Sequence, residues 1–451
     1  NWLHFLDEFK WGGCLADDMG LGKTIQMLAF LLAQSQKHKN ATNLIVVPTT
    51  LIFNWEQEIE KFCPQMKYTI FHSTARPEEI DHFKEYDLVI TTYGVVIRDI
   101  DKLADFKFHY VVLDESQAIK NPLSMRFKAV SKLKANGRIA MTGTPVENNT
   151  FDLFAQMSFV NPGLLGSSEF FKETFSNAID KRGDASQADA LKKLISPFII
   201  HRTKTQVLKD LPAKTESILM CEMESQQRKV YEAFKEDVRK KLMQRIEEEG
   251  MAKAGIYIID GLLKLRQLCN SPALIKTEED YGDESIKIKE LMRNILEKTG
   301  NHKILVFSQF VKMLRLIEPH LQENNIGYCY LDGQTTNRQD VVKDFIENDE
   351  KRVFLISLKA GGVGLNLTIA DYVFLVDPWW NPAVEAQAID RTHRIGQDKK
   401  VFAYKMICKD TIEEKILQLQ QKKKKLSEDL ISTEQGFLKN ITKDDLAYLL
   451  K

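Results

Sequence analysis

Short runs of aliphatic and β-branched residues recur through the first third of the chain and alternate with amphipathic stretches. The runs are "NLIVVP" at 43–48, "DLVITTYG" at 87–94, "HYVVLDES" at 109–116 and "RIAMTGTP" at 138–145. The amphipathic stretches include "TIQMLAFLLAQSQ" and "LIFNWEQEIEKF". Strands that are apolar along their whole length are typical of parallel sheets buried on both faces. The pattern therefore predicts a parallel sheet that helices cover on both sides.

The same alternation returns near the C-terminus. Its runs are "KILVFSQF" at 303–310, "YCYLDG" at 328–333, "RVFLIS" at 352–357, "YVFLVD" at 372–377 and "FAYKMI" at 402–407. The part between about 150 and 300 is instead mostly helical and charged, and "FKEDVRKKLMQRIEEEG" is its clearest helix. The tail from 410 is also predicted to be helical, with one basic run, "QQKKKKL". We therefore predict an α/β fold with two lobes, helical insertions and a helical C-terminal tail.

Composition narrows the class of protein without naming its chemistry. A chain of 451 residues is too long for one hydrophobic core, so two or three domains are expected. No apolar run approaches the ~20 residues of a membrane-spanning helix. No signal peptide is recognisable, and because the sequence starts at Asn1 without a Met we expect residues upstream of it.

Charge and cysteine usage point to an intracellular protein. The 63 basic residues balance 63 acidic ones, so any nucleic-acid surface must come from local clustering. The 6 cysteines are scattered without a C-x-x-C pair. This usage indicates reduced thiols in a cytoplasmic or nuclear protein (or in the nucleoid of a prokaryote), with neither a zinc site nor a disulfide framework.

A glycine-rich stretch, "GLGKT", precedes a long helical pattern and is the first candidate for chemistry. Gly20 and Gly22 let backbone N–H groups approach phosphate oxygens, and the helix N-terminus adds its positive dipole. Lys23 would reach the β and γ phosphates, and Thr24 would offer its hydroxyl to Mg²⁺. Asp17 stands where the generic phosphate-loop pattern has its first glycine. The alternative is an ordinary helix start with an exposed lysine.

The run "VVLDES" ends a predicted buried strand in two adjacent acids. The carboxyl edge of a parallel sheet is where α/β proteins bind ligands. There Asp114 would hold Mg²⁺ through water, and Glu115 would orient and deprotonate an attacking water. The alternative is a polar cap after a strand. A lysine, a metal ligand and a base in this order along the chain favour hydrolysis of a phosphoanhydride.

Two arginines stand three positions apart in "AIDRTHRIGQ", residues 388–397. At helical spacing Arg391 and Arg394 would fall on one face, so two guanidinium groups would point the same way. Two positive groups that point the same way suggest a binding site for an anion. The alternative is an arginine pair held by ion pairs on a surface helix.

These motifs and several others occur in one order along nearly the whole chain. They are "LADDMGLGKT", "LIVVPTTLIFNWEQEI", "VITTYG", "LDESQAIKN", "AMTGTPVENN", "HRTKTQVLKDLPAKTE", "ILVFSQF", "LDGQTT" and "KAGGVGLNLTIADYVFLVDPWWNPAVEAQAIDRTHRIGQ". The chain resembles the Swi/Snf (chromatin-remodeller-type) ATPases of helicase superfamily two. The last segment is the most specific, and Asp17 in the phosphate loop belongs to the family's form of that motif.

The resemblance implies an α/β fold of two RecA-like lobes with parallel sheets. The first lobe would span 1–210, with a helical insertion at about 150–195. The second would span 211–451, with an insertion at about 222–295, motor motifs at 303–407 and the helical tail at 410–451. It also implies ATP and Mg²⁺ as cofactors, with Asp17, Gly20, Gly22, Lys23, Thr24, Asp114 and Glu115 around the nucleotide.

Arginine fingers are what the resemblance implies for the second lobe. Arg391 and Arg394 would act on ATP bound to the first lobe, with Gln387 one turn earlier. Gln117 takes the place of the histidine of a DEAH-type tetrad, so we expect weaker coupling rather than lost hydrolysis; Thr142 and Thr144 resemble the motif that ties the two sites together. The family's adenine-reading glutamine lies upstream of "NWLHFL", which leaves the purine pocket incomplete in this sequence and predicts weaker nucleotide binding.

Duplex DNA is the track that the resemblance implies, gripped mainly through phosphates and without strand separation. We expect the contacts at Thr49, Thr50, Asn54 and Thr92 in the first lobe and at Ser308, Gln309, Lys359, Gly362 and Trp380 in the second. Hydroxyls, amides and helix N-termini hold phosphates without reading bases. Each Thr or Ser has an ordinary turn or cap role as its alternative, and for "HRTKTQV" at 201–207 we favour a structural role over DNA contact.

Three functions remain open at this stage. The first is a DNA-dependent ATPase that translocates on duplex DNA and remodels a protein–DNA complex. The second is an RNA or single-strand helicase of the same superfamily, which "DPWWNP" and "HRIGQ" disfavour. The third is a nucleotide-gated scaffold with little hydrolysis, which the intact Lys23, Asp114, Glu115 and both arginines disfavour.

Overall fold

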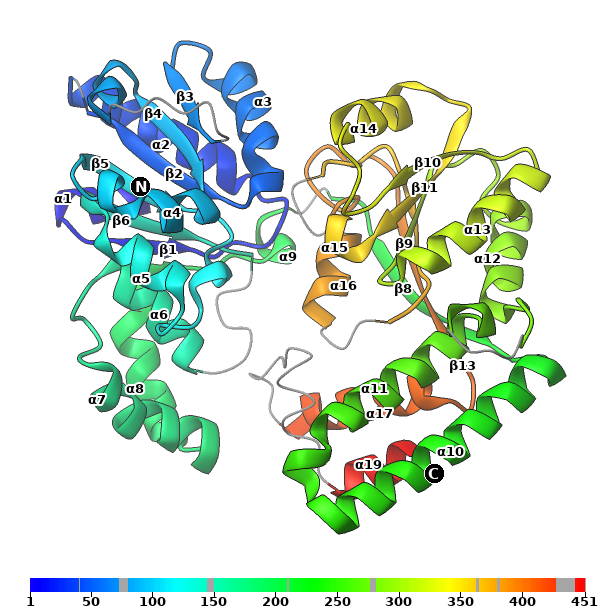
Figure 1. Cartoon of the computed structure of the whole chain (residues 1–451). Coiled ribbons are helices and arrows are strands. Elements are labelled where there is room, and N and C mark those ends of the chain that lie inside the picture. Colours follow the sequence, from blue (N-terminus) through cyan, green and yellow to red (C-terminus); the bar gives the residue numbers. More distant parts are fainter. Residues whose placement is uncertain are drawn as a thin grey trace. The chain divides into compact units, whose positions relative to one another are not determined.

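Two compact lobes make up the chain in a computed structural model. The structure describes residues 1–39, 41–72, 80–143, 150–208, 211–275, 281–361, 365–378, 382–426 and 443–450. The first lobe is Asn1–Asp210 and the second is Leu211–Lys451. Each lobe contains its own parallel sheet with helices on both faces (Figure 1). The α/β fold with two parallel-sheet lobes, predicted from the sequence, is confirmed.

The first lobe is built on seven parallel strands. In spatial order they are β3 (Tyr68–Phe71), β4 (Leu88–Thr92), β2 (Asn43–Val47), β5 (Lys107–Leu113), β6 (Lys134–Met141), β1 (Gly13–Leu15) and β7 (Ile199–Ile200). Because all run the same way, the loops that follow β1, β2, β4, β5 and β6 lie at one edge of the sheet. Among the described residues, that edge carries the phosphate loop, Asp114, Glu115 and Thr142.

Helices of the first lobe connect these strands. They are α1 (Trp2–Glu8), α2 (Lys23–Lys37), α3 (Ile52–Phe62), α4 (Tyr93–Leu103), α5 (Met125–Lys132), α6 (Thr150–Val160), α7 (Ser168–Phe171), the π-helical η4 (Lys172–Lys181), α8 (Ala185–Ile195) and α9 (Lys204–Val207). Short 3₁₀ turns are η1 (Thr49–Leu51), η2 (Ile80–Glu85), η3 (Ser116–Ile119) and η5 (Ser196–Phe198). The predicted helices at "TIQMLAFLLAQSQ" and "LIFNWEQEIEKF" correspond to α2 and α3.

The second lobe has six parallel strands. In spatial order they are β10 (Gly327–Leu331), β11 (Lys351–Ser357), β9 (Ile304–Ser308), β12 (Tyr372–Leu375), β13 (Val401–Cys408) and β8 (Lys214–Cys221). Its helices are α10 (Ser225–Glu249), α11 (Met251–Asn270), α12 (Ile286–Glu297), α13 (Val311–Glu323), α14 (Arg338–Glu347), α15 (Leu358–Gly361), α16 (Pro382–Ile389), α17 (Ile412–Leu426) and α19 (Lys443–Leu450), with η6 (Pro272–Leu274). In Figure 1, α10 and α11 form a long hairpin beside α17 and α19.

Alternate residues of the central strands enter two different cores. Ile304 and Val306 of β9 belong to the core that α10–α13 and the tail helices cover. Leu305 and Phe307 belong to the core on the opposite face, which α14–α16 cover. Both sets are apolar because both faces are buried, which explains the continuous apolar runs.

Some strands carry no usable sequence signal. β1 and β7 are too short to show a period, and β8 has polar residues at exposed positions because it is the edge strand beside β13. No helix within the described parts of the chain is long and apolar enough to cross a membrane. All 6 cysteines are buried free thiols.

Candidate functional site

The loop between β1 and α2 has the backbone of a phosphate-binding turn. Gly20 and Gly22 adopt φ values of 90° and 74°, a region in which a Cβ would be strained. Gly22 is the N-cap of α2, and Lys23 is the helix's first residue. Free N–H groups at a helix start favour anions, and the dipole adds to this. Thr24 is half-buried in the same first turn.

The ammonium group of Lys23 is held by backbone oxygens of the loop that precedes it. Its Nζ donates to the backbone oxygens of Asp17 at 2.6 Å and Asp18 at 3.3 Å. Burial lowers the pKa of Lys23, and the carboxylates of Glu115 and Asp114 partly offset that shift. The lysine therefore lies within the electrostatic reach of both acids that follow β5.

Asp114 is fixed in place at the carboxyl end of β5. Its Oδ2 accepts a hydrogen bond from Trp55 Nε1 at 2.9 Å, and Tyr93 Oη donates to its backbone oxygen at 2.8 Å. Burial, followed by the adjacent charge of Glu115, raises the pKa of Asp114 above that of an ordinary carboxyl group. Two crowded carboxylates of this kind are suited to a divalent cation, which would relieve their repulsion. The residues that would hold Mg²⁺ thus fit it.

Glu115 has a left-handed backbone, with φ 49° and ψ 53°. This conformation costs a non-glycine residue ~1–3 kcal/mol, so its surroundings must enforce it. The Glu115 N–H donates to Asp114 Oδ1 at 2.9 Å, and Gln117 Nε2 donates to Glu115 Oε2 at 2.6 Å. Thr142 Oγ1 in turn donates to Gln117 Oε1 at 3.1 Å. Gln117 therefore joins the proposed base to the residue that follows β6.

Asp17 requires a correction. We predicted it among the nucleotide ligands, but its carboxylate is only 1% exposed and is bound by Arg202 through backbone and guanidinium N–H groups. The sequence did not indicate this pair, because 185 positions separate the two residues. Trp55 and Tyr93 were missed for the same reason. The favoured structural role for residues 201–207 agrees with β7, which closes the sheet beside β1 just before them.

A cavity of about 630 Å³ lies next to this loop in the first lobe. Gln26 and Arg202, which both contact Asp17, form one wall. The start of α1 and the apolar face of α2 at Phe30 form the rest. Its size and its mixed lining suit a nucleoside beside a phosphate loop.

The arginine pair of the second lobe does not lie on a helix, contrary to our prediction. α16 ends at Ile389, and residues 390–396 form turns. Thr392 Oγ1 donates to the Ile389 oxygen at 2.8 Å, which favours this helix end. Arg391 is buried and Arg394 is half-buried, so the two side chains differ in environment. Gln387 is half-buried on α16.

Several predicted DNA contacts can be placed. Thr49 and Thr50 are exposed in η1, and Asn54 is half-buried in α3. Thr92 is wrong as a direct contact in this conformation, because it is buried and its hydroxyl caps α4 by accepting from Val95 N at 3.4 Å. Lys359 lies in α15. Thr144, Gly362 and Trp380 lie outside the described residues.

Ser308 needs the same correction. It is fully buried at the end of β9, and its hydroxyl donates to Asp377. Gln309 N donates to the other Asp377 oxygen at 2.8 Å. Burial raises the pKa of Asp377 to about 6 against these hydrogen bonds. Ser308 therefore positions the neighbouring loop, whereas Gln309 is half-buried and remains a candidate contact.

Comparison with known proteins decides the family. Residues 1–274 match the model described as SNF2-related domain, and residues 286–396 match the helicase conserved C-terminal domain. The first match alone covers more than half of the chain. The chain belongs to the SNF2 family. The SNF2-related match runs past the lobe boundary and includes β8, α10 and α11, which fold as part of the second lobe.

Relatives in the SNF2 family carry names of ATP-dependent enzymes. An uncharacterised ATP-dependent helicase of Mycoplasma genitalium is 37% identical over 458 residues, covering 100% of this chain and 43% of that protein. The ISWI chromatin-remodeling complex ATPase CHR11 of Arabidopsis thaliana is 34% identical over 479 residues, with 100% and 44% covered. The chain thus spans less than half the length of these curated relatives.

One SNF2-family structure is similar over nearly the whole chain. It is the Sulfolobus solfataricus SWI2/SNF2 ATPase core in complex with dsDNA, with 37% identity, 99% of this chain and 94% of that chain covered, and a TM-score of 0.47.

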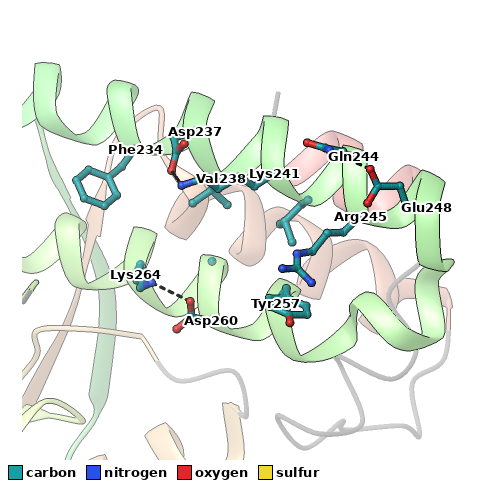
Figure 2. A pocket seen from close by; sticks show the side chains of 12 residues that line it. Phe234, Asp237, Val238, Lys241, Gln244, Arg245, Glu248, Tyr257, Asp260 and Lys264 are labelled. Carbon is teal, nitrogen blue, oxygen red and sulfur yellow. Dashed lines mark hydrogen bonds and ion pairs between the residues drawn. The ribbon is translucent and has the colours of Figure 1, made fainter.

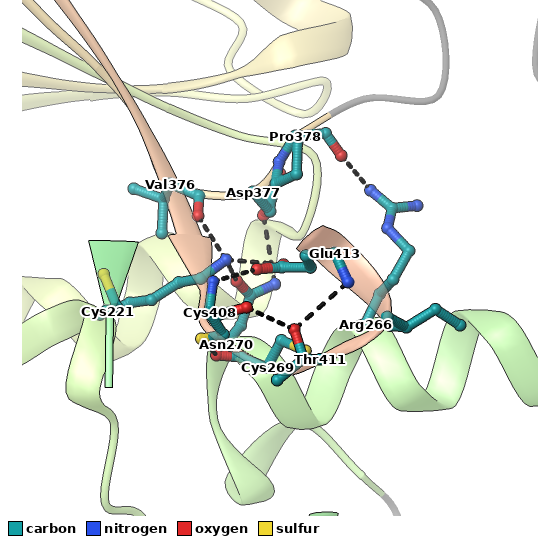
Figure 3. A network of polar contacts seen from close by, with 12 residues as sticks. Cys221, Arg266, Cys269, Asn270, Val376, Asp377, Pro378, Cys408, Thr411 and Glu413 are labelled. Carbon is teal, nitrogen blue, oxygen red and sulfur yellow. Dashed lines mark hydrogen bonds and ion pairs between the residues drawn. The ribbon is translucent and has the colours of Figure 1, made fainter. Parts of the chain in front are cut away.

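A buried polar network braces the strand ends of the second SNF2 lobe (Figure 3). Lys287 Nζ donates to Glu413 Oε1 at 2.7 Å, to the Val376 oxygen at 2.7 Å and to Asn270 Oδ1 at 3.0 Å. Both partners of the ion pair are 0% exposed. Burial favours the neutral amine, but the charge and hydrogen bond of Glu413 together with the neighbouring Cys408 and Cys269 outweigh it and raise the pKa of Lys287. Arg266 extends the network by donating to the Pro378 oxygen.

The same region contains a three-residue group with metal-ligand chemistry. Cys269, Cys408 and Glu413 place one ligand atom each within 4.8 Å of one another. Glu413, however, already pairs with Lys287, and the Cys408 thiol donates to the Cys269 oxygen at 3.2 Å. Burial raises the pKa of Cys408 well above its ordinary value. A protonated thiol beside an ammonium group suits packing rather than a cation.

Replacing Lys287 with methionine is expected to lower the free energy of unfolding by about 3–5 kcal/mol, because Glu413 would remain buried without its partner. Urea denaturation of the whole chain measures this. The double variant Lys287→Met, Glu413→Leu should recover much of the loss, since two apolar residues need no compensation. A double variant no more stable than the single one would show that other contacts of Lys287 dominate.

A groove of about 610 Å³ between α10 and α11 has a different character (Figure 2). Its polar side chains satisfy one another: Lys241 pairs with Asp237 at 2.8 Å and Lys264 with Asp260 at 2.9 Å. Arg245 lies over the Tyr257 ring at 3.5 Å. Because it holds none of the predicted catalytic residues, we do not regard the groove as the site of chemistry.

Proposed function

We propose that the chain hydrolyses ATP with Mg²⁺ and uses the cycle to translocate along duplex DNA, remodelling protein–DNA complexes without separating strands. The observation that supports this best is the placement of Lys23, Asp114 and Glu115 at one edge of one sheet. Each is held by contacts that orient its functional atoms. The names of the SNF2 relatives as ATP-dependent enzymes agree with it.

The proposed chemistry divides among these residues. Lys23 and the N–H groups at the start of α2 would hold the β and γ phosphates. Glu115 would orient and deprotonate the attacking water. Its left-handed backbone conformation places the carboxylate where Gln117 Nε2 donates a hydrogen bond to it. Mg²⁺, held by Asp114 and Thr24, would offset the charge that develops on the phosphate oxygens.

The coupling of ATP hydrolysis to translocation on DNA would depend on Gln117 and on the second lobe. Gln117 contacts both Glu115 and Thr142, so a shift in the loop after β6 would reorient the base. Arg391 and Arg394 would act as arginine fingers on ATP that the first lobe binds, so that hydrolysis changes how the lobes engage. The DNA track is supported by the relative CHR11, whose name describes the ATPase of a chromatin-remodeling complex.

ATP turnover with and without duplex DNA tests the proposal. We expect duplex DNA to stimulate turnover several-fold and more strongly than single-stranded RNA. Stronger stimulation by single-stranded RNA would favour an RNA helicase. Negligible turnover with every nucleic acid would favour a nucleotide-gated scaffold.

DNA affinity is expected to fall steeply with salt and to change little with sequence, because the proposed contacts are to phosphates. Fluorescence anisotropy with duplexes of different sequence at two salt concentrations measures both effects. The Thr49→Ala, Thr50→Ala double variant should weaken all duplexes alike. A strong preference for one duplex at fixed salt would contradict phosphate-based gripping.

A further inference from the structure

Asp17 and Arg202 form an ion pair that is much more elaborate than a surface contact. Arg202 Nε donates to Asp17 Oδ1 at 3.0 Å and to Oδ2 at 3.2 Å, its Nη2 donates to Oδ2, and its backbone N–H donates to Oδ1 at 3.0 Å. Gln26 completes the arrangement by accepting from Arg202 Nη2 at 2.7 Å and donating to Asp17 Oδ2 at 3.4 Å. Such a two-pronged pair fixes geometry as well as charge.

The burial of the two partners is unequal. The Asp17 side chain is 1% exposed, whereas that of Arg202 is 40% exposed. A buried carboxylate without a counter-charge is strongly unfavourable. Asp17 therefore depends on Arg202 more than Arg202 depends on Asp17.

A ladder of backbone contacts extends this pairing along the chain. Ala16 N donates to the Ile200 oxygen at 2.8 Å, and Asp18 N donates to the Arg202 oxygen at 3.0 Å. Lys204 N then donates to Asp18 Oδ2 at 2.8 Å. The first half of the phosphate loop thus lies along the segment Ile200–Lys204, which continues the pairing of β1 with β7.

Asp17 and Asp18 also hold Lys23, the catalytic lysine. Lys23 Nζ donates to the backbone oxygens of Asp17 and Asp18. The positions of those oxygens follow from the contacts that Arg202 and Lys204 make. A loop that must receive a polyanion would also repel it if the Asp17 charge were left uncompensated.

We propose that Arg202 is a positioning residue of the nucleotide site, which neutralises Asp17 and thereby makes the phosphate loop receptive to a triphosphate. The inference rests on the proposed ATP site. It explains why this chain has an aspartate where the generic phosphate loop has a glycine: Asp17 anchors the loop to the segment Ile200–Lys204. Arg202 acts through Asp17 and not as a ligand of the phosphates.

A double-mutant cycle in the whole chain tests this. We expect Arg202→Gln to weaken binding of a fluorescent ATP analogue at least tenfold and to raise the KM for ATP more than it lowers kcat. Asp17→Asn alone should bind the analogue as tightly as the unaltered protein or tighter, because the amide oxygen can still accept from the Arg202 backbone N–H and Nε and so keeps the loop anchored. In the Arg202→Gln background, Asp17→Asn should restore most of the lost affinity, because the uncompensated charge is gone.

Matched variants make the result specific. Arg182→Gln removes an exposed arginine from the same lobe and should leave binding unchanged. Arg202→Lys keeps the charge without the planar fork of donors. Its affinity for the ATP analogue should therefore lie between that of the unaltered protein and that of Arg202→Gln. Thermal melting reports whether each variant folds, and if Arg202→Gln does not, Asp17→Asn and Arg202→Lys still decide the question.

Two results would overturn the inference. One is an equal loss of affinity on removing Arg202 with and without Asp17→Asn, as expected for a direct phosphate ligand. The other is weakened binding in Asp17→Asn alone, as expected if Asp17 contacts the nucleotide. If the unaltered protein bound no ATP analogue, the proposed function itself would fail, which is a separate outcome.

Discussion

Replacing Arg391 or Arg394 with alanine is expected to lower DNA-stimulated ATP turnover by orders of magnitude, with ~10³–10⁵-fold as the range for arginine fingers generally. A guanidinium group offers a planar fork of donors to charge that spreads over phosphoryl oxygens. Lysine lacks that fork, so Arg→Lys variants should not recover turnover. Because Lys23 and its loop belong to the first lobe, much of the ATP binding should remain.

The two arginines call for different controls. Arg391 is buried, so Arg391→Ala needs a parallel unfolding curve to separate lost chemistry from lost packing. Arg394 is half-buried and is the cleaner test. Arg239→Ala, which removes an exposed arginine from α10, should leave turnover unchanged. Unaltered turnover in the Arg391→Ala, Arg394→Ala double variant would exclude both as fingers.

Replacing Glu115 with glutamine is expected to reduce turnover by ~10²–10⁴-fold while ATP binding survives, since a general base contributes about that much to the rate. The amide keeps the shape of the side chain and can still accept from Gln117, but it cannot take a proton from water. Single-turnover measurements alongside equilibrium binding of an ATP analogue separate the two effects.

Lys23→Ala provides the contrast, because removing the ammonium group should weaken ATP binding as well as turnover. Glu173→Gln, which changes an exposed glutamate of the same lobe, serves as the matched control. Near-normal hydrolysis by Glu115→Gln would remove Glu115 as the base.

The sequence predicted the strands and helices best where burial acts on every residue of a run. β2, β4 and β9 are buried throughout and match their predicted runs to within a few residues. β8 escaped prediction because an edge strand with polar, exposed positions lacks that signature. The end of α16 at Ile389 was also missed, since its helical period continues through residues that instead turn at Thr392.

The residues of the candidate site also differ in whether the sequence could predict them. Lys23, Asp114 and Glu115 could be found because each is adjacent in sequence to the glycines or the strand that positions it. Arg202 could not, because nothing local in the chain pairs it with Asp17 across 185 positions. Ser308 and Thr92 were misjudged because a hydroxyl after a strand can face solvent or the interior, and only the packing around it decides.

The position of β8 in the second sheet has a consequence for how the protein is made. β8 pairs only with β13 among the described strands, yet roughly 180 residues separate Cys221 from Val401. At ~5–20 residues per second on the ribosome, β8 would wait roughly 10–40 s for its partner. β1 of the first lobe waits in the same way, because its partners β6 and β7 follow it by roughly 120 and 180 residues. During that interval the backbone N–H and C=O groups of β8 would have no partner strand, so chaperones would meet an unpaired strand edge.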